Sequence, residues 1–105
     1  MTRTVLTMTQ VAGRLGVSPR TIRLYERHGF ITLERCGGRC LVGPTEIEVI
    51  ALIERLKADL GINLSGVGVI LEMRRKMMEL QNRLNEWERE FDQRLAQALE
   101  NSRRP

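Results

Sequence analysis

The sequence predicts a mostly α-helical protein. We expect a winged helix-turn-helix domain with a small β-hairpin wing, followed by a long C-terminal dimerisation helix that forms an antiparallel coiled coil. Three features predict it: helix-start residues and an arginine face in residues 18–29, a Gly-Gly turn between β-favourable runs in residues 30–42, and an apolar heptad in residues 70–91. We assign the domain to residues 1–74 and the coiled-coil helix to residues 75–105.

The first helix of the helix-turn-helix is predicted to follow Thr7. Thr7 and Gln10 have the spacing of a capping box, in which each side chain bonds the backbone N–H of the other residue. Val5 and Leu6 before it favour a short strand, and the helix should end near Leu15, ahead of a glycine-containing turn.

The second helix is predicted to have a basic face. Ser18 is a preferred N-cap, Pro19 suits the first helical position, and Gly29 stands where a left-handed residue ends a helix. Three arginines at i, i+3 and i+7 share one face, whereas Ile22 and Tyr25 point roughly the other way. These arginines are Arg20, Arg23 and Arg27. Spacing alone leaves two interpretations open, a solvated face of a structural helix or a face that meets an anionic partner.

Positive charge is concentrated in the N-terminal part of the chain. The net charge is +4, but residues 1–43 contain seven arginines against two glutamates, and residues 44–105 contain ten basic against eleven acidic side chains. The planar arginine fork suits phosphate, so this distribution favours nucleic acid over a membrane as partner. Residues 1–10 lack the apolar segment of a signal peptide, and no apolar run has the length of a transmembrane helix, which predicts a cytoplasmic protein.

Residues 30–42 are predicted to form the wing, because Gly-Gly between two β-favourable runs indicates a hairpin. Arg35 and Arg39 near its tip are placed to meet a DNA backbone, and the alternative is a surface hairpin with solvated arginines. A three-residue loop would place Cys36 and Cys40 opposite each other, where a disulfide is geometrically feasible. A reducing cytoplasm argues against a permanent disulfide, and two thiolates are too few for a closed zinc site. We expect two free thiols first, a reversible redox pair next, and a metal site last.

A third helix is predicted to begin at Pro44 and to end at Gly61, with an apolar core face that reaches Leu60. Asn63 can cap a fourth helix. Two glycines near the start of that helix weaken its first turns or permit a close helix contact, Gly66 and Gly68.

The fourth helix is predicted to be long and to pair with a second copy. Residues 69–101 contain no glycine or proline, and apolar residues recur at alternating steps of three and four, as in a coiled coil. The predicted dimer interface consists of Ile70, Met73, Met77, Leu80, Leu84, Trp87, Phe91 and Leu95. An antiparallel register that pairs Leu80 with Leu84 brings basic positions beside acidic positions of the partner, and a parallel register gains less. The alternative is a helix that folds back on its own domain.

The chain contains a single histidine, and a structural role is expected for it before a catalytic one. His28 falls in the last turn of the second helix, where partial positive charge is favourable. No base and nucleophile can be grouped from the remaining sequence, so we expect neither an enzyme nor a cofactor.

Three stretches of the chain match a known family. They read Thr-Met-Thr-Gln-Val-Ala in residues 7–12, Leu-Gly-Val-Ser-Pro-Arg-Thr-Ile-Arg-Leu-Tyr-Glu-Arg-His-Gly in residues 15–29, and Leu-Gly-Ile-Asn-Leu-Ser-Gly-Val in residues 60–67. With these stretches the chain resembles the MerR family of bacterial transcription regulators over nearly its whole length. Residues 61–84 look most like the heat-shock repressor (HspR) branch, and also like the chaperone modulator CbpM, which binds a J-domain co-chaperone.

The resemblance implies a homodimer that binds a pseudo-palindromic promoter site in double-stranded DNA. It places DNA contacts on the second helix and the wing, at Ser18, Arg20, Thr21, Arg23, Tyr25 and Arg39. The charge pattern adds three arginines to this set, Arg14, Arg27 and Arg35. We expect an HspR-like repressor of chaperone and stress genes, with a DnaK or J-domain chaperone as a further partner. The alternative is a CbpM-like adaptor that binds a J-domain co-chaperone.

Overall fold

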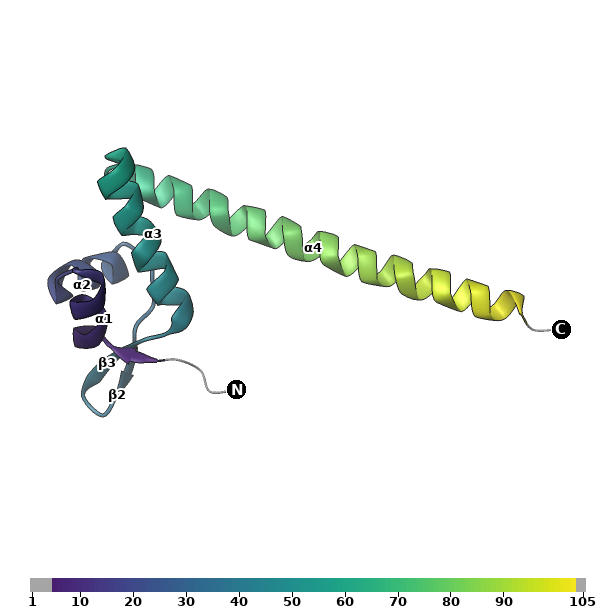
Figure 1. The fold of residues 1–105 in the computed structure, drawn as a ribbon, viewed down its shortest axis with the longest axis horizontal. Coiled ribbons are helices and arrows are strands. Elements are labelled where there is room, and N and C mark those ends of the chain that lie inside the picture. Colours follow the sequence, from purple (N-terminus) through teal and green to yellow (C-terminus); the bar gives the residue numbers. More distant parts are fainter. Residues whose placement is uncertain (1–4, 104–105) are drawn as a thin grey trace. The chain divides into compact units, whose positions relative to one another are not determined.

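A computed structural model describes residues 5–103 and divides the chain into two units, residues 1–69 and 70–105 (Figure 1). The elements in chain order are β1 (Leu6–Thr7), α1 (Met8–Leu15), α2 (Pro19–Arg27), β2 (Glu34–Cys36), β3 (Arg39–Val42), α3 (Pro44–Leu60) and α4 (Leu64–Ser102). The first unit holds every element up to the start of α4, and the second consists of the rest of α4. The mostly helical winged helix-turn-helix with a long C-terminal helix is therefore confirmed.

The caps of α1 and α2 are the ones that the sequence predicts. Thr7 Oγ1 accepts a hydrogen bond from the Gln10 backbone N–H at 3.2 Å, and Gln10 Oε1 accepts one from the Thr7 N–H at 2.9 Å. Ser18 Oγ accepts from the Thr21 N–H at 3.1 Å, with proline at the first position of α2. Gly29 has a φ of 77°, a left-handed conformation that favours glycine. These local bonds satisfy amides that a helix start leaves free.

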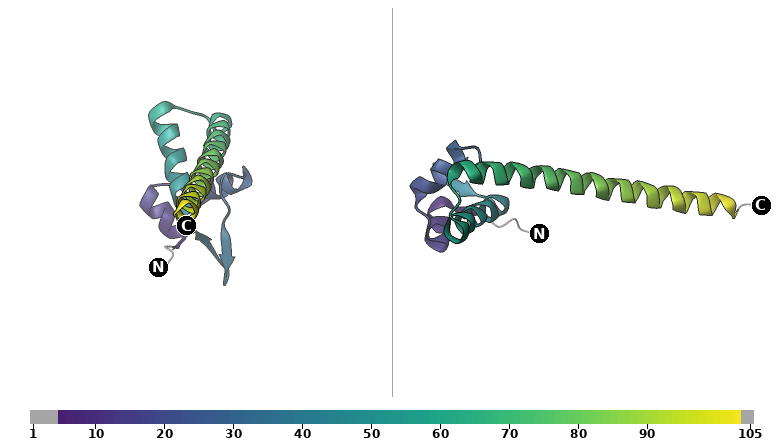
Figure 2. Two further views of the ribbon diagram at one scale, coloured as in Figure 1. Left: turned by 90° about the vertical axis from the view of Figure 1, so that its right-hand side faces the viewer. Right: turned by 90° about the horizontal axis from the view of Figure 1, so that it is seen from above.

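The wing is a hairpin with a two-residue turn. Gly37 and Gly38 both have positive φ, 57° and 77°, and β3 lies between β1 and β2 in a three-stranded antiparallel sheet. The hairpin projects away from the helices of the first unit (Figure 2). Its register pairs Cys36 with Arg39 and Arg35 with Cys40.

This register corrects the expected cysteine geometry. Side chains alternate between the two faces of a strand, and directly paired residues share a face. Cys36 and Cys40 each pair with an arginine, so they lie on opposite faces of the hairpin and are both free thiols. A two-residue turn replaces the predicted three-residue loop because both glycines adopt the left-handed conformation that it requires.

The core of the first unit lies where α1, α2, α3, the sheet and the start of α4 meet. Its fully buried side chains are Val11, Ile22, Tyr25, Val42, Ile50, Ile53 and Val67. Helix α3 begins with Pro44 and ends at Gly61, as predicted. The core face of α3 is shorter than predicted. It was expected to reach Leu60, but that side chain is 68% exposed.

Two glycines shape the start of α4. Asn63 Oδ1 accepts a hydrogen bond from the Gly66 N–H at 2.8 Å, which confirms the predicted cap. A Cβ at Gly66 would lie 2.7 Å from Ile62 Cγ2, closer than side chains tolerate. A Cβ at Gly68 would lie 3.5 Å from Phe30 Cε1, an ordinary contact. The absence of a side chain is therefore required at Gly66 and is dispensable at Gly68.

Alanine substitutions at these two glycines should have different effects. Gly68→Ala is expected to raise the free energy of unfolding by about 0.5–1 kcal/mol, because alanine favours a helix interior and fits beside Phe30. In Gly66→Ala the steric clash with Ile62 should outweigh this gain, so the free energy of unfolding should fall. Thermal melting of both variants at one protein concentration measures the difference, and equal shifts in the two melting temperatures would contradict the packing at Gly66.

The second unit is a helix whose apolar stripe is uncovered in the single chain. Its large exposed apolar side chains are Met73, Met77, Met78, Leu80, Leu84, Trp87, Phe91, Leu95 and Leu99. Arg75 forms ion pairs with Glu72 and Glu79 one turn away on the same helix. Such exposed ion pairs contribute little stability. A continuous exposed apolar surface such as this stripe marks a site of interaction with another molecule. Among the helices in residues 5–103, none combines the length and apolar character needed to cross a bilayer.

Candidate nucleic-acid interface

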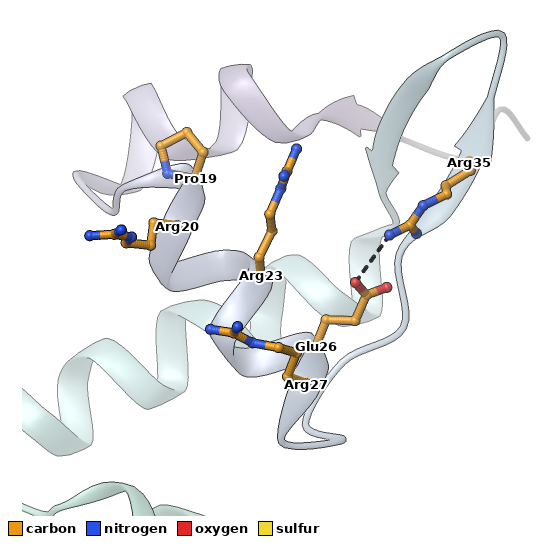
Figure 3. Close-up of a pocket in the computed structure, with 6 residues that line it drawn as sticks. All are labelled: Pro19, Arg20, Arg23, Glu26, Arg27 and Arg35. Atoms are coloured by element: carbon orange, nitrogen blue, oxygen red, sulfur yellow. Dashed lines mark hydrogen bonds and ion pairs between the residues drawn. The ribbon is translucent and has the colours of Figure 1, made fainter.

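The basic face of α2 forms an open groove. It is lined by Pro19, Arg20, Arg23, Glu26, Arg27 and Arg35, so four guanidinium groups and one carboxylate share it (Figure 3). The three arginines of α2 are exposed, and none of them forms an ion pair with another residue in the described range 5–103. Their charges are consequently free to meet an anion.

A second groove joins this face to the wing. It is lined by Arg23, Gly38, Arg39 and Cys40, and by Thr7, Met8 and Thr9 at the start of α1. Arg23 lines both grooves, so it stands where the surfaces of α2 and the wing meet. The α1 residues were not predicted as site residues. The capping box could have indicated them, since it marks a helix start, where free amides and the helix dipole favour anions.

Glu26 connects α2 to the wing. Its Oε1 accepts a hydrogen bond from Arg35 Nη2 at 3.4 Å, and its Oε2 accepts one from the Leu33 backbone N–H at 3.3 Å. Figure 3 shows Arg35 extending from β2 toward this carboxylate. The bond to Glu26 raises the pKa of the Arg35 guanidinium. Arg35, predicted as a DNA contact, is thus paired with a carboxylate in the free chain.

Tyr25 is buried, which corrects its predicted role as a direct DNA contact. Its side chain has no exposed surface. Its hydroxyl donates a hydrogen bond to Glu54 Oε1 at 2.5 Å and accepts one from Lys57 Nζ at 2.9 Å. Tyr25 lies with Ile22 on the face of α2 opposite the arginines, as the helical spacing indicates. Its side chain fixes α2 against α3.

Tyr25→Phe should lower the free energy of unfolding by about 1–2 kcal/mol at neutral pH, because it removes two hydrogen bonds in a partly buried network. Burial raises the pKa of Tyr25 above 10.0, and the bond to Tyr25 raises that of Lys57 above 10.5. A group whose pKa is raised in the folded state contributes stability that is fully present below its unfolded pKa and is lost as the pH rises through its folded pKa. The wild type should therefore lose more stability than the variant between pH 8 and about pH 11.

Thermal melting at fixed protein concentration measures this difference. Thr32→Val is a matched control, since Thr32 is exposed and its hydroxyl bonds no other residue in the described range 5–103. The same loss of stability at high pH in the wild type and in Tyr25→Phe would contradict the network.

The other predicted DNA contacts, and the single histidine, lie in the first unit. Arg14 is exposed in the last turn of α1 and lines neither groove. The Ser18 and Thr21 hydroxyls bond each other at 2.9 Å at the start of α2. His28 ends α2 and its ring stacks on Phe30 at 5.4 Å between centroids. Among residues 5–103, no three His, Cys, Asp or Glu side chains form a group that suits a metal ion.

An exposed arginine face on the second helix of a helix-turn-helix, joined by a groove to a wing, defines the class of winged helix-turn-helix regulatory proteins. The chain belongs to the MerR family: residues 6–74 match the model of the MerR HTH family regulatory proteins. This family and fold are those of a regulator and not of an enzyme class.

The chain is similar to two further proteins. A Streptomyces coelicolor protein assigned the name heat shock protein HspR is 37% identical over 78 residues, which cover 72% of this chain and 52% of that protein. The chain thus spans about half the length of this curated relative. The crystal structure of HiNmlR, a MerR family regulator that lacks the sensor domain and is bound to promoter DNA, matches 95% of this chain and 77% of its own with a TM-score of 0.62 and 21% identity. That likeness supports the fold.

Proposed function

We propose that the chain binds double-stranded promoter DNA and regulates transcription in the cytoplasm. The observation that supports this most is the set of exposed arginines on α2, which form no ion pair within the part of the chain that the structure describes. This set is continuous through Arg23 with the groove beside the wing. Helix α2 would enter the major groove and the wing would meet the backbone beside it. HiNmlR, which has a similar fold, is bound to promoter DNA in its crystal structure, and this supports promoter DNA as the ligand.

The proposed regulation is HspR-like repression of chaperone and stress genes. It is supported by the relative that bears the name heat shock protein HspR and matches 72% of this chain. A DnaK or J-domain chaperone as partner stays a prediction. The CbpM-like adaptor would need no arginine face, so the exposed Arg20, Arg23 and Arg27 favour DNA over that alternative.

We propose that α4 makes the chain a homodimer. An antiparallel register that places Leu80 of one copy opposite Leu84 of the other also places Met77 opposite Trp87 and Met73 opposite Phe91. Each aromatic ring then meets a flexible thioether, a favourable pairing. All six side chains are exposed in the single chain. Ile70 and Leu95 extend the same stripe at its two ends.

Selection of the full chain against a pool of random-sequence duplexes tests the proposal. A homodimer should enrich an inverted repeat, because two-fold symmetry in the protein requires matching half-sites. Binding should weaken steeply with salt, since arginines displace counterions from phosphates. An enriched site without symmetry would contradict the homodimer. No duplex bound at low salt would contradict DNA binding, and recovery of a J-domain protein by the same preparation would then favour the adaptor.

A further inference from the structure

Glu26 is an unexpected residue for a surface that binds an anion. Among the described residues 5–103, it is the one acidic side chain that lines the groove of α2, which it shares with four arginines. A carboxylate there repels phosphate and therefore reduces the affinity for every duplex, whatever its sequence. Its other contacts indicate what it contributes in return.

We propose that Glu26 determines specificity by holding the wing against α2, a proposal that rests on the DNA-binding function above. One carboxylate oxygen binds the Arg35 side chain and the other binds the Leu33 backbone N–H. Arg35 belongs to β2, and Leu33 directly precedes that strand. Glu26 thus fixes both the backbone and a side chain of the wing to the helix that would read the bases.

The position of the wing matters because base contacts specify a sequence only when the helix and the backbone contacts share one register. Glu26 also removes one arginine from the set that can bind phosphate freely. Without its charge, Arg35 would be released to meet any phosphate, and the wing would be free to shift. General affinity would rise and the preference for one sequence would fall. Glu26 is therefore a positioning residue for DNA recognition.

Glu26→Gln separates these effects, because the amide retains the shape of the side chain but loses its charge and keeps a single acceptor oxygen. Its NH2 group can only donate, so the variant loses at least one of the two hydrogen bonds that Arg35 and Leu33 donate to Glu26. Affinity for an unrelated duplex of random sequence should rise about five- to tenfold near 0.1 M salt, and the slope of log affinity against log salt should steepen by about one phosphate contact for each protomer. The ratio of affinities for the selected and the unrelated duplex should fall about tenfold or more. Glu48→Gln is the matched control, since Glu48 is exposed on α3 and lines neither groove.

The double variant Glu26→Gln with Arg35→Ala identifies the released group. It should lose the steeper salt slope, whereas Arg35→Ala alone should leave the wild-type slope nearly unchanged. Amide hydrogen exchange of Leu33 in the free protein gives a readout that needs no DNA, and it should accelerate in Glu26→Gln and not in Glu48→Gln. Wild-type protein that binds no duplex would overturn the proposed function. Wild-type binding with identical behaviour of Glu26→Gln and Glu48→Gln would overturn the role of Glu26 alone.

Discussion

Arg23→Ala is expected to reduce the affinity of the proposed homodimer for the selected duplex at least about 30-fold, because each half-site loses one contact, while affinity for an unrelated duplex falls much less. Arg23 is exposed in the middle of α2 and lines both the groove of the basic face and the groove beside the wing. A bidentate arginine contact to a base edge contributes about 1–3 kcal/mol of discrimination, and Arg23 has the most central position for one. Fluorescence anisotropy with labelled duplexes measures both affinities.

Two further variants distinguish base recognition from charge. Arg39→Ala, at the wing end of the second groove, should reduce affinity for all duplexes alike and reduce the salt slope by about one phosphate contact for each protomer. Arg55→Ala removes the same charge from an exposed site on α3 that lines neither groove, and it should change little. If Arg23→Ala and Arg55→Ala had the same effect on the selected duplex, Arg23 would have no role in recognition.

The elements of this fold could be predicted because their boundaries depend on bonds between near neighbours in sequence. Thr7 with Gln10, Ser18 with Thr21, and Asn63 with Gly66 each form a cap across three residues. A capping side chain and the amide it satisfies are adjacent in the printed sequence, so residue type and spacing suffice. The arginine face of α2 could be predicted for the same reason, since helical periodicity alone sets it.

The contacts between elements could not be predicted in this way. Glu26 meets the wing through Arg35 and Leu33, and Tyr25 meets α3 through Glu54, 29 residues away. Such partners are chosen by tertiary packing, and neither the heptad nor the capping pattern contains that information. Tyr25 also shows two inferences in conflict. Helical spacing placed it on the inner face and the family resemblance placed it on DNA, and the burial of its side chain supports the spacing.

Trp87→Ala should have the largest effect on assembly, raising the dissociation constant of the proposed dimer at least about 1000-fold. Trp87 is 74% exposed in the single chain and stands on the apolar stripe of α4. Truncation of a buried aromatic residue at an interface costs about 2–4 kcal/mol, and two-fold symmetry makes every substitution count twice. Sedimentation at micromolar concentration should show a dimer for the wild type and a monomer for the variant. Gln93→Ala, on the polar side of the same helix, is the control and should remain a dimer.

The partner of Trp87 distinguishes the two helix orientations. In the antiparallel register Trp87 faces Met77 of the other copy, whereas in a parallel pair it faces Trp87. A double-mutant cycle between Trp87→Ala and Met77→Ala should therefore give a coupling energy of about 0.5–1.5 kcal/mol for each contact in the antiparallel dimer, and none in the parallel one. The orientation has a consequence for DNA. In the proposed antiparallel dimer, the two copies of α4 would begin at opposite ends of the coiled coil, and each first unit would bind one half-site. A monomer with an intact arginine face should therefore bind the inverted repeat only weakly.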